Sequence, residues 1–112
     1  VSLISDERLI EQCVRDGVHI EACPTSNLRT RAVSSLSEHP ALELLDRGVS
    51  VSLNSDDPGL FAITLSGELQ VAQKYLGFTD ANLKRATQCA LEASFVSQAL
   101  KDRYLSDHGQ WL

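Results

Sequence analysis

The stretch that decides the fold reads Val49-Ser50-Val51-Ser52-Leu53 and runs directly into Asn54-Ser55-Asp56-Asp57-Pro58. Apolar and hydroxyl side chains alternate over the first five residues, which is the period of a half-buried β-strand. The Asp-Asp pair stands where this strand gives way to a turn at Pro58-Gly59. Neighbouring carboxylates repel each other, so both ionise readily only when a cation or hydrogen-bond donors compensate them. The pair is a candidate metal or substrate site, and the alternative is a solvated turn that Asp caps.

A second alternating stretch, residues 18–23, ends at Pro24 and predicts another strand. Polar residues 25–37 have no clear period and predict a loop with room for one short turn. Caps, helical spacing and closing glycines predict helices around the strands. Three of these helices run from Ser5-Asp6-Glu7 to Gly17, from Pro40 to Gly48 and from about 66 to 76. A fourth begins at a Thr79 cap and carries Leu83, Ala86, Ala90 and Leu91 on one face. A fifth begins at a Ser97 cap. Alternating strands and helices indicate an α/β fold with a parallel sheet. Two strands are too few for such a sheet, so the pattern is typical of part of a larger fold.

Composition limits the classes of partner and compartment. The 112 residues suit one domain, 1–112, and a hydrophobic content of 43% supports a core. A net charge of −5 without a basic stripe argues against nucleic acid and anionic membranes. No apolar run is long enough to span a bilayer. The three cysteines, Cys13, Cys23 and Cys89, are odd in number and scattered. They favour a reducing, cytoplasmic setting over a disulfide framework.

Other chemistry-bearing residues carry weaker signals. Cys23-Pro24-Thr25-Ser26-Asn27 follows the first strand as the Asp-Asp pair follows the second. Its small polar groups either line a pocket or, as we favour, order the loop. Cys23 as a nucleophile needs a nearby base that the sequence does not show. His19, His39 and His108 lack the spacing of metal ligands. Near the end of the chain, Trp111 is expected to anchor the tail by packing.

Taken together, these stretches resemble the C-terminal part of the adenosine deaminase family. The matching segments are Glu21-Ala22-Cys23-Pro24-Thr25-Ser26-Asn27, Glu38-His39-Pro40, Ser52-Leu53-Asn54-Ser55-Asp56-Asp57-Pro58 and Glu92-Ala93-Ser94-Phe95. Their order and separation fit, and the match covers nearly the whole chain. An Asp-Asp-Pro by itself is a weak signal. The Cys-Pro-Thr-Ser-Asn loop with Asn-Ser-Asp-Asp-Pro one strand later is far more specific.

The resemblance implies a fold, a reaction and two site residues. The fold is a (β/α)₈ TIM barrel with one catalytic zinc at the C-terminal ends of its strands, and this chain supplies the seventh and eighth strands and the closing helices. Asp56 matches the zinc-ligand aspartate, and Asp57 matches the aspartate that hydrogen-bonds the purine ring. The implied reaction is hydrolytic deamination of a 6-aminopurine compound, with adenosine as the first choice. Adenine and aminodeoxyfutalosine are the alternatives.

The chain also departs from the family's pattern. The family's His-x-His pair, its later histidine ligand and the glutamate that protonates the ring are missing from this sequence. One carboxylate cannot hold a catalytic zinc that expects several protein ligands. We therefore expect the other zinc ligands to lie outside this chain and the chain alone to be an inactive fragment. Its expected partner is the rest of the parent barrel. The alternative from another class is a non-catalytic half-barrel that associates with itself or a partner through exposed sheet edges.

Overall fold

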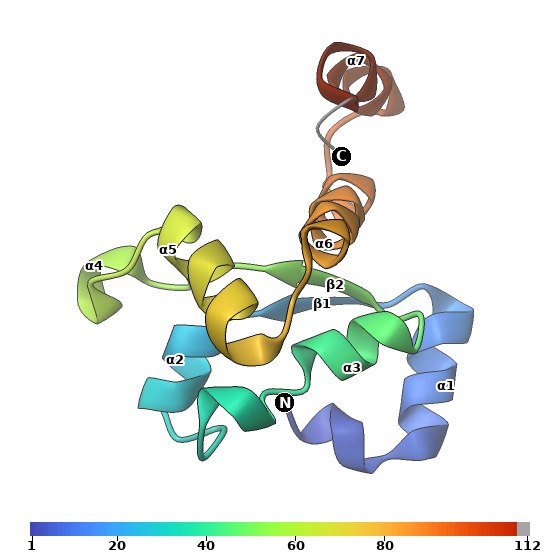
Figure 1. Cartoon of the computed structure of the whole chain (residues 1–112). Helices are drawn as coiled ribbons and strands as arrows, with labels where there is room; N and C mark the ends of the chain where they lie inside the picture. Colours follow the sequence, from blue (N-terminus) through green and yellow to red (C-terminus); the bar gives the residue numbers. More distant parts are fainter. Residues whose placement is uncertain (110–112) are drawn as a thin grey trace.

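The computed structural model describes residues 1–109 and shows helices arranged around a small parallel sheet (Figure 1). In chain order the elements are a 3₁₀ turn at Ser2–Ser5, α1 (Glu7–Asp16), β1 (His19–Ala22), α2 (Pro24–Arg29), a 3₁₀ turn at Leu36–Glu38, α3 (Ala41–Asp46), β2 (Ser50–Leu53), α4 (Pro58–Phe61), α5 (Leu65–Val71), a π-helical turn at Ala72–Leu76, α6 (Asp80–Ala93) and α7 (Gln98–His108). The prediction for Trp111 lies outside the described residues.

The two strands stand where the alternating stretches predict them and pair in parallel. His19 lies opposite Ser50, and Ala22 lies opposite Leu53. The pairing continues one residue further, because the backbone N–H of Asn54 donates to the carbonyl of Ala22 at 2.8 Å. In parallel strands the carboxyl ends lie at the same end of the sheet. The two loops that carry the polar motifs therefore start side by side.

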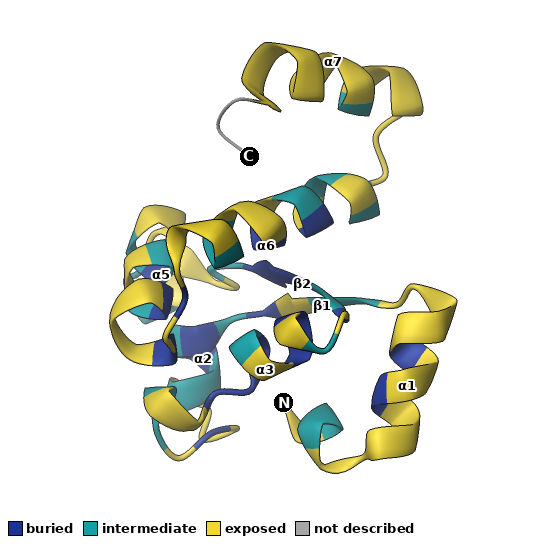
Figure 2. Ribbon diagram, turned by 45° about the vertical axis from the view of Figure 1, so that its right-hand side comes forward, coloured by how far each residue is buried: buried dark blue, intermediate teal, exposed yellow. Residues whose placement is uncertain are grey.

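The apolar core lies on one face of this sheet. Ala22, Val51 and Leu53 alternate with polar residues and are buried. They share one cluster with apolar side chains from α1, α3, the π-helical turn and α6, chiefly Ile10, Ala41, Leu44, Leu45, Ala72, Leu76, Ala86 and Cys89. Figure 2 shows buried residues in β2, at the end of β1 and on parts of α1, α2, α3 and α6. The packing of this face leaves the other face, with His19 and Glu21, for polar groups.

The last helix stands apart from this core. Ser97 caps α7 as predicted, accepting from the backbone N–H of Leu100 at 3.3 Å. Lys101 Nζ donates to the carbonyl of Glu92 at 2.7 Å, which ties α7 to the end of α6. Figures 1 and 2 show α7 beyond α6 and away from the sheet. Its side chains contribute nothing to the candidate site described below.

The structure refines three local predictions. The short turn allowed for in the loop at 25–37 is longer than expected: it is α2, a six-residue helix that is too short to show a period and begins with Pro24 in a favoured first position. On α6, Ala86 is buried and Leu83 packs against the core as predicted, whereas Ala90 is exposed and Cys89 is buried in its place. The helix expected from about 66 to 76 is confirmed, with its end at Gly77, but its last five residues form a π-helical turn rather than a regular α-helix.

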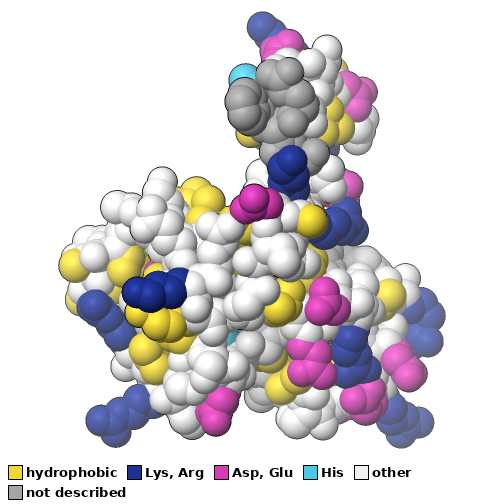
Figure 3. All heavy atoms as spheres, in the orientation of Figure 1, with side chains coloured by type: hydrophobic (Ala, Val, Ile, Leu, Met, Phe, Trp, Pro, Cys, Tyr) yellow, Lys and Arg dark blue, Asp and Glu magenta, His cyan; other side chains and the backbone are white. Residues whose placement is uncertain are grey.

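The surface carries charges of both signs. On the face shown in Figure 3, Lys and Arg side chains are interspersed with Asp and Glu and form no continuous basic area. No helix within residues 1–109 is long and apolar enough to cross a membrane. The expectation against nucleic acid partners stays a prediction from the net charge of −5.

Candidate active site

One hydrogen bond joins the loops that follow the two strands. Ser26 Oγ, in the first turn of α2, donates to Asp56 Oδ2 at 2.8 Å, although 30 residues separate the two in the chain. Ser26 is buried and Asp56 is exposed. The bond therefore orders the carboxylate of Asp56 while the residue stays accessible to a ligand.

The backbone of Asp56 is itself unusual. Its φ of 58° lies in the left-handed region, which a non-glycine residue adopts at a cost of order 1 kcal/mol, although Asp tolerates it better than most. This conformation turns the chain sharply after the strand. Strain of this kind persists where the surrounding structure demands it, and it is concentrated at functional sites. The left-handed turn supports Asp56 as a site residue on grounds that the sequence pattern does not contain.

Asp57 has a different local role. Its Oδ1 accepts from the backbone N–H of Leu60 at 3.0 Å and caps α4, which starts at Pro58. The alternative of a capping aspartate is thus confirmed for Asp57. The turn expected at Pro58-Gly59 is a single helical turn. A capping bond occupies one carboxylate oxygen, so it does not conflict with a ligand contact at the other.

Glu68 is a site residue that the sequence pattern did not reveal. It lies on α5, is only 1% exposed, and its Oε2 accepts from the backbone N–H of Thr25 at the start of α2 at 3.1 Å. Its other oxygen, Oε1, is buried and has no hydrogen-bond partner among residues 1–109. A glutamate in a polar stretch of helix reads as a surface residue, and 43 positions separate it from Thr25. No local signal marks its burial.

His39 supports the first residues of α2 through Asn27. Its Nδ1 accepts from the backbone N–H of Ala41 at 3.2 Å, so the proton is on Nε2, which donates to Asn27 Oδ1 at 2.8 Å. Burial lowers the pKa of His39 to about 4, so the ring is neutral near pH 7. The Glu38-His39-Pro40 segment therefore serves the Cys23-to-Asn27 loop as a support. This role agrees with the absence of metal-type spacing around His39.

Cys23 carries no sign of nucleophilic activation. Burial raises the pKa of its thiol, and the carboxylates of Asp56, Glu21 and Glu68 raise it further. A nucleophilic cysteine instead needs a lowered pKa or an adjacent base. The structure thus agrees with the reading of this loop as ordered polar structure rather than as a cysteine active site. All three cysteines are free thiols.

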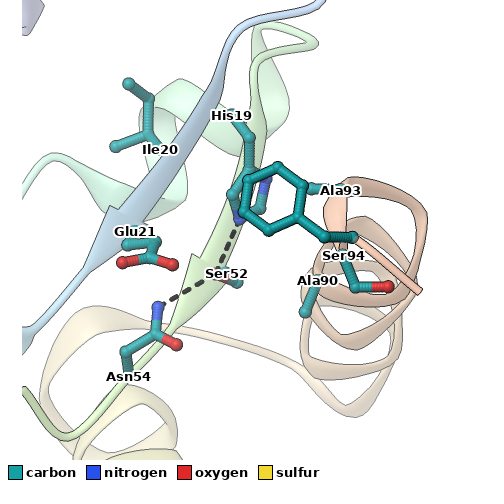
Figure 4. Close-up of a pocket in the computed structure, with 9 residues that line it drawn as sticks. His19, Ile20, Glu21, Ser52, Asn54, Ala90, Ala93 and Ser94 are labelled. Atoms are coloured by element: carbon teal, nitrogen blue, oxygen red, sulfur yellow. Dashed lines mark hydrogen bonds between the residues drawn. The ribbon is translucent and has the colours of Figure 1, made fainter.

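A hollow of about 850 Å³ opens on the polar face of the sheet (Figure 4). It is lined by His19, Ile20, Glu21, Ser52, Asn54 and, from the end of α6, Ala90, Ala93, Ser94 and Phe95. The ring nitrogens of His19 lie 2.8 Å from Ser50 Oγ and 2.9 Å from Ser52 Oγ, and burial lowers its pKa. Both nitrogens are thus engaged by hydroxyls, which leaves neither as a free metal ligand.

The described residues do not form a complete metal centre. Within residues 1–109, no three His, Cys, Asp or Glu side chains come together in a group that could hold a metal ion. A catalytic zinc takes about three protein ligands. Asp56 offers one carboxylate, so this chain fits a single ligand of such a site and no more.

Two features define the class of protein. Helices connect parallel strands, and the strained, hydrogen-bonded polar residues gather at the carboxyl ends of those strands, which is where α/β barrel enzymes hold their active sites. A family model described as adenosine deaminase matches residues 1–110. The chain belongs to the adenosine deaminase family.

The curated relatives are named for two substrates. An adenine deaminase from Sinorhizobium fredii is 38% identical over 106 residues, which are 95% of this chain and 33% of the relative. An adenosine deaminase from Shewanella loihica is 38% identical over 99 residues, which are 88% of this chain and 30% of the relative. The chain therefore spans about a third of the length of the relatives it matches.

Solved structures show the same relation. An adenine deaminase from Arthrobacter aurescens superposes with a TM-score of 0.90 at 31% identity, over 96% of this chain and 33% of that one. An amidohydrolase from Burkholderia ambifaria, crystallised with bound zinc, superposes with a TM-score of 0.83 at 20% identity, over 98% of this chain and 30% of that one. The α/β fold is thus that of one part of a deaminase barrel, as the motifs imply.

Proposed function

We propose that this chain is part of a zinc-dependent hydrolase that deaminates a 6-aminopurine compound. In this proposal β1 and β2 are the seventh and eighth strands of a (β/α)₈ barrel, and the remaining strands supply the other metal ligands. The observation that carries the proposal is the Ser26–Asp56 hydrogen bond at 2.8 Å, which brings both family motifs to one place. The bound zinc of the Burkholderia ambifaria amidohydrolase supports the choice of metal.

The two aspartates divide the work in this proposal. Asp56 is the metal ligand, because it is exposed, strained and held at one oxygen by Ser26. Asp57 hydrogen-bonds the purine ring, and its capping bond to Leu60 fixes the direction of its carboxylate. A metal ion at such a site lowers the pKa of bound water toward neutrality. In the overall reaction, water replaces the 6-amino group of the purine and ammonia leaves.

The substrate is proposed at the level of the purine base. The family resemblance makes adenosine the first candidate, and the relatives named adenine deaminase make adenine the second. The residues that surround the ribose of a nucleoside lie mostly outside this chain in the proposed barrel. Ammonia release from adenosine, adenine and aminodeoxyfutalosine, measured side by side, ranks the three.

An Asp56→Ala variant tests the metal role in the complete deaminase that contains these residues. We expect metal analysis to show zinc in the wild type and a loss of more than about 100-fold in zinc affinity in the variant, because loss of an outer-shell partner alone costs about 10- to 100-fold, with deamination lost in parallel. Asp46→Ala, at the end of α3, is a matched control that removes a carboxylate far from the site. Full zinc content and full activity in Asp56→Ala would refute the assignment.

A further inference from the structure

A buried carboxylate stands behind the candidate site and stabilises little by itself. Glu68 is 1% exposed, makes one hydrogen bond, and leaves Oε1 without a partner among the described residues. An unsatisfied buried polar atom costs about 1–3 kcal/mol. An apolar side chain of the same volume avoids that cost but leaves the backbone N–H of Thr25 without its acceptor. Local packing does not require a carboxylate at this position, whereas the bond to Thr25 does require an acceptor.

The position of Glu68 shows what that acceptor holds in place. Its Oε2 holds the backbone N–H of Thr25, and the next residue, Ser26, donates from Oγ to Asp56 Oδ2. The residue after that, Asn27, accepts from His39. Three consecutive residues at the start of α2 are thus anchored to three separate segments: α5, the turn after β2 and the segment before α3. The bond to Glu68 is the one that ties α2 to α5.

We propose that Glu68 is a positioning residue for Asp56 and acts through α2. By holding Thr25, it sets the height and rotation of the first turn of α2 and so brings the Ser26 hydroxyl against Asp56 Oδ2. The Asp56 carboxylate then presents a single orientation to a ligand. This inference rests on the proposed function, in which that ligand is a zinc ion.

Three variants of the complete deaminase test whether Glu68 positions Asp56 through Ser26, with zinc affinity measured by chelator competition. Glu68→Met keeps a buried side chain of similar size but removes the oxygen acceptor, and Ser26→Ala removes the hydroxyl. We expect each to lower zinc affinity by about 10- to 100-fold, as is usual when a group that orients a metal ligand is lost. Glu68→Gln keeps an oxygen for Thr25 and stays within about threefold of the wild type. The conservative variant thus separates loss of the bond from loss of the charge.

The double variant Glu68→Met/Ser26→Ala shows whether the two residues act in series. If Glu68 acts through Ser26, the second substitution adds little to the first. The zinc affinity of the double variant should then lie within about threefold of that of the weaker-binding single variant. If the loss of zinc affinity in the double variant equals the product of the two single losses, Glu68 does not act through Ser26. A wild-type zinc affinity in Glu68→Met would also overturn the inference.

Stability is controlled separately. Thr79→Ala removes the cap of α6, costs about 1 kcal/mol and leaves zinc affinity unchanged. A drop in zinc affinity with Thr79→Ala equal to that with Glu68→Met would mean that stability alone is responsible, and would overturn the inference. A wild type that holds no zinc refutes the proposed function first, and this inference with it.

Discussion

At the scale of the residue, two adjacent aspartates do different things. Asp56 has a left-handed backbone and accepts from Ser26, whereas Asp57 is extended and caps α4. Their adjacency and mutual repulsion predict a candidate site from the sequence. Asp56 accepts from Ser26 and Asp57 caps α4 because of the left-handed turn at Asp56 and the position of α2. Neither feature can be read from the order of residues.

His39 is expected to make stability depend on pH. Protonation of Nδ1 breaks its bond to the Ala41 N–H, and burial lowers the folded-state pKa from 6.5 to about 4. Because the folded pKa lies below the unfolded one, the stabilisation is complete above about pH 6.5 and is lost as pH falls toward 4. We expect the free energy of unfolding in urea to fall by about 2 kcal/mol from pH 7 to pH 5 through this residue.

The comparison with His39→Gln isolates this contribution. Glutamine lacks a titrating group, and its amide offers both a donor and an acceptor. The fall in unfolding free energy between pH 7 and pH 5 should therefore be smaller in the variant by about the same 2 kcal/mol. Identical pH dependence of the two proteins would contradict the buried, neutral state of His39.

At the scale of the element, short helices were the features most poorly predicted. α2 and α4 have six and four residues, less than two turns each, so their apolar residues show no period. Longer elements with caps were predicted well: Thr79 and Ser97 begin α6 and α7 as expected. Capping is a local interaction over three residues and is therefore readable from sequence.

The cap of α4 allows the two roles of Asp57 to be separated. Asp57→Asn keeps an oxygen for the Leu60 N–H, so unfolding free energy should change by no more than about 0.5 kcal/mol. A charged acceptor binds a donor more strongly than a neutral one, so KM for the purine should rise about tenfold. Asp57→Ala should lose both stability and binding. An unchanged KM in Asp57→Asn would count against the purine role.

At the scale of the whole molecule, the sheet is incomplete. Within the described part of the chain it has two strands, so each strand has one unpaired edge. A parallel sheet is normally covered and has several strands, and a pair alone is marginally stable. Large apolar side chains are also exposed, notably Leu60, Leu65 and Phe95. The exposed edges and side chains match the surface that the rest of a barrel would cover.

This incompleteness predicts the behaviour of the isolated 112-residue chain. We expect size-exclusion chromatography with light scattering to show association above the monomer mass, because open strand edges pair readily with other chains. We also expect the isolated chain to unfold at a low urea concentration. The midpoint of urea unfolding should be far higher for the complete deaminase. A compact, stable monomer would contradict both expectations. A defined, stable dimer without zinc would instead favour the non-catalytic interaction module.

The sequence by itself determined the strands, the longer helices, most of the caps and the two loop motifs, and through them the family. These features are local, because each depends on residues a few positions apart. Only the tertiary structure decided that Ser26 meets Asp56, that Glu68 is buried behind Thr25, and that His39 supports Asn27. These contacts span 12 to 43 residues of chain, and the folded path alone determines which distant groups come within bonding distance.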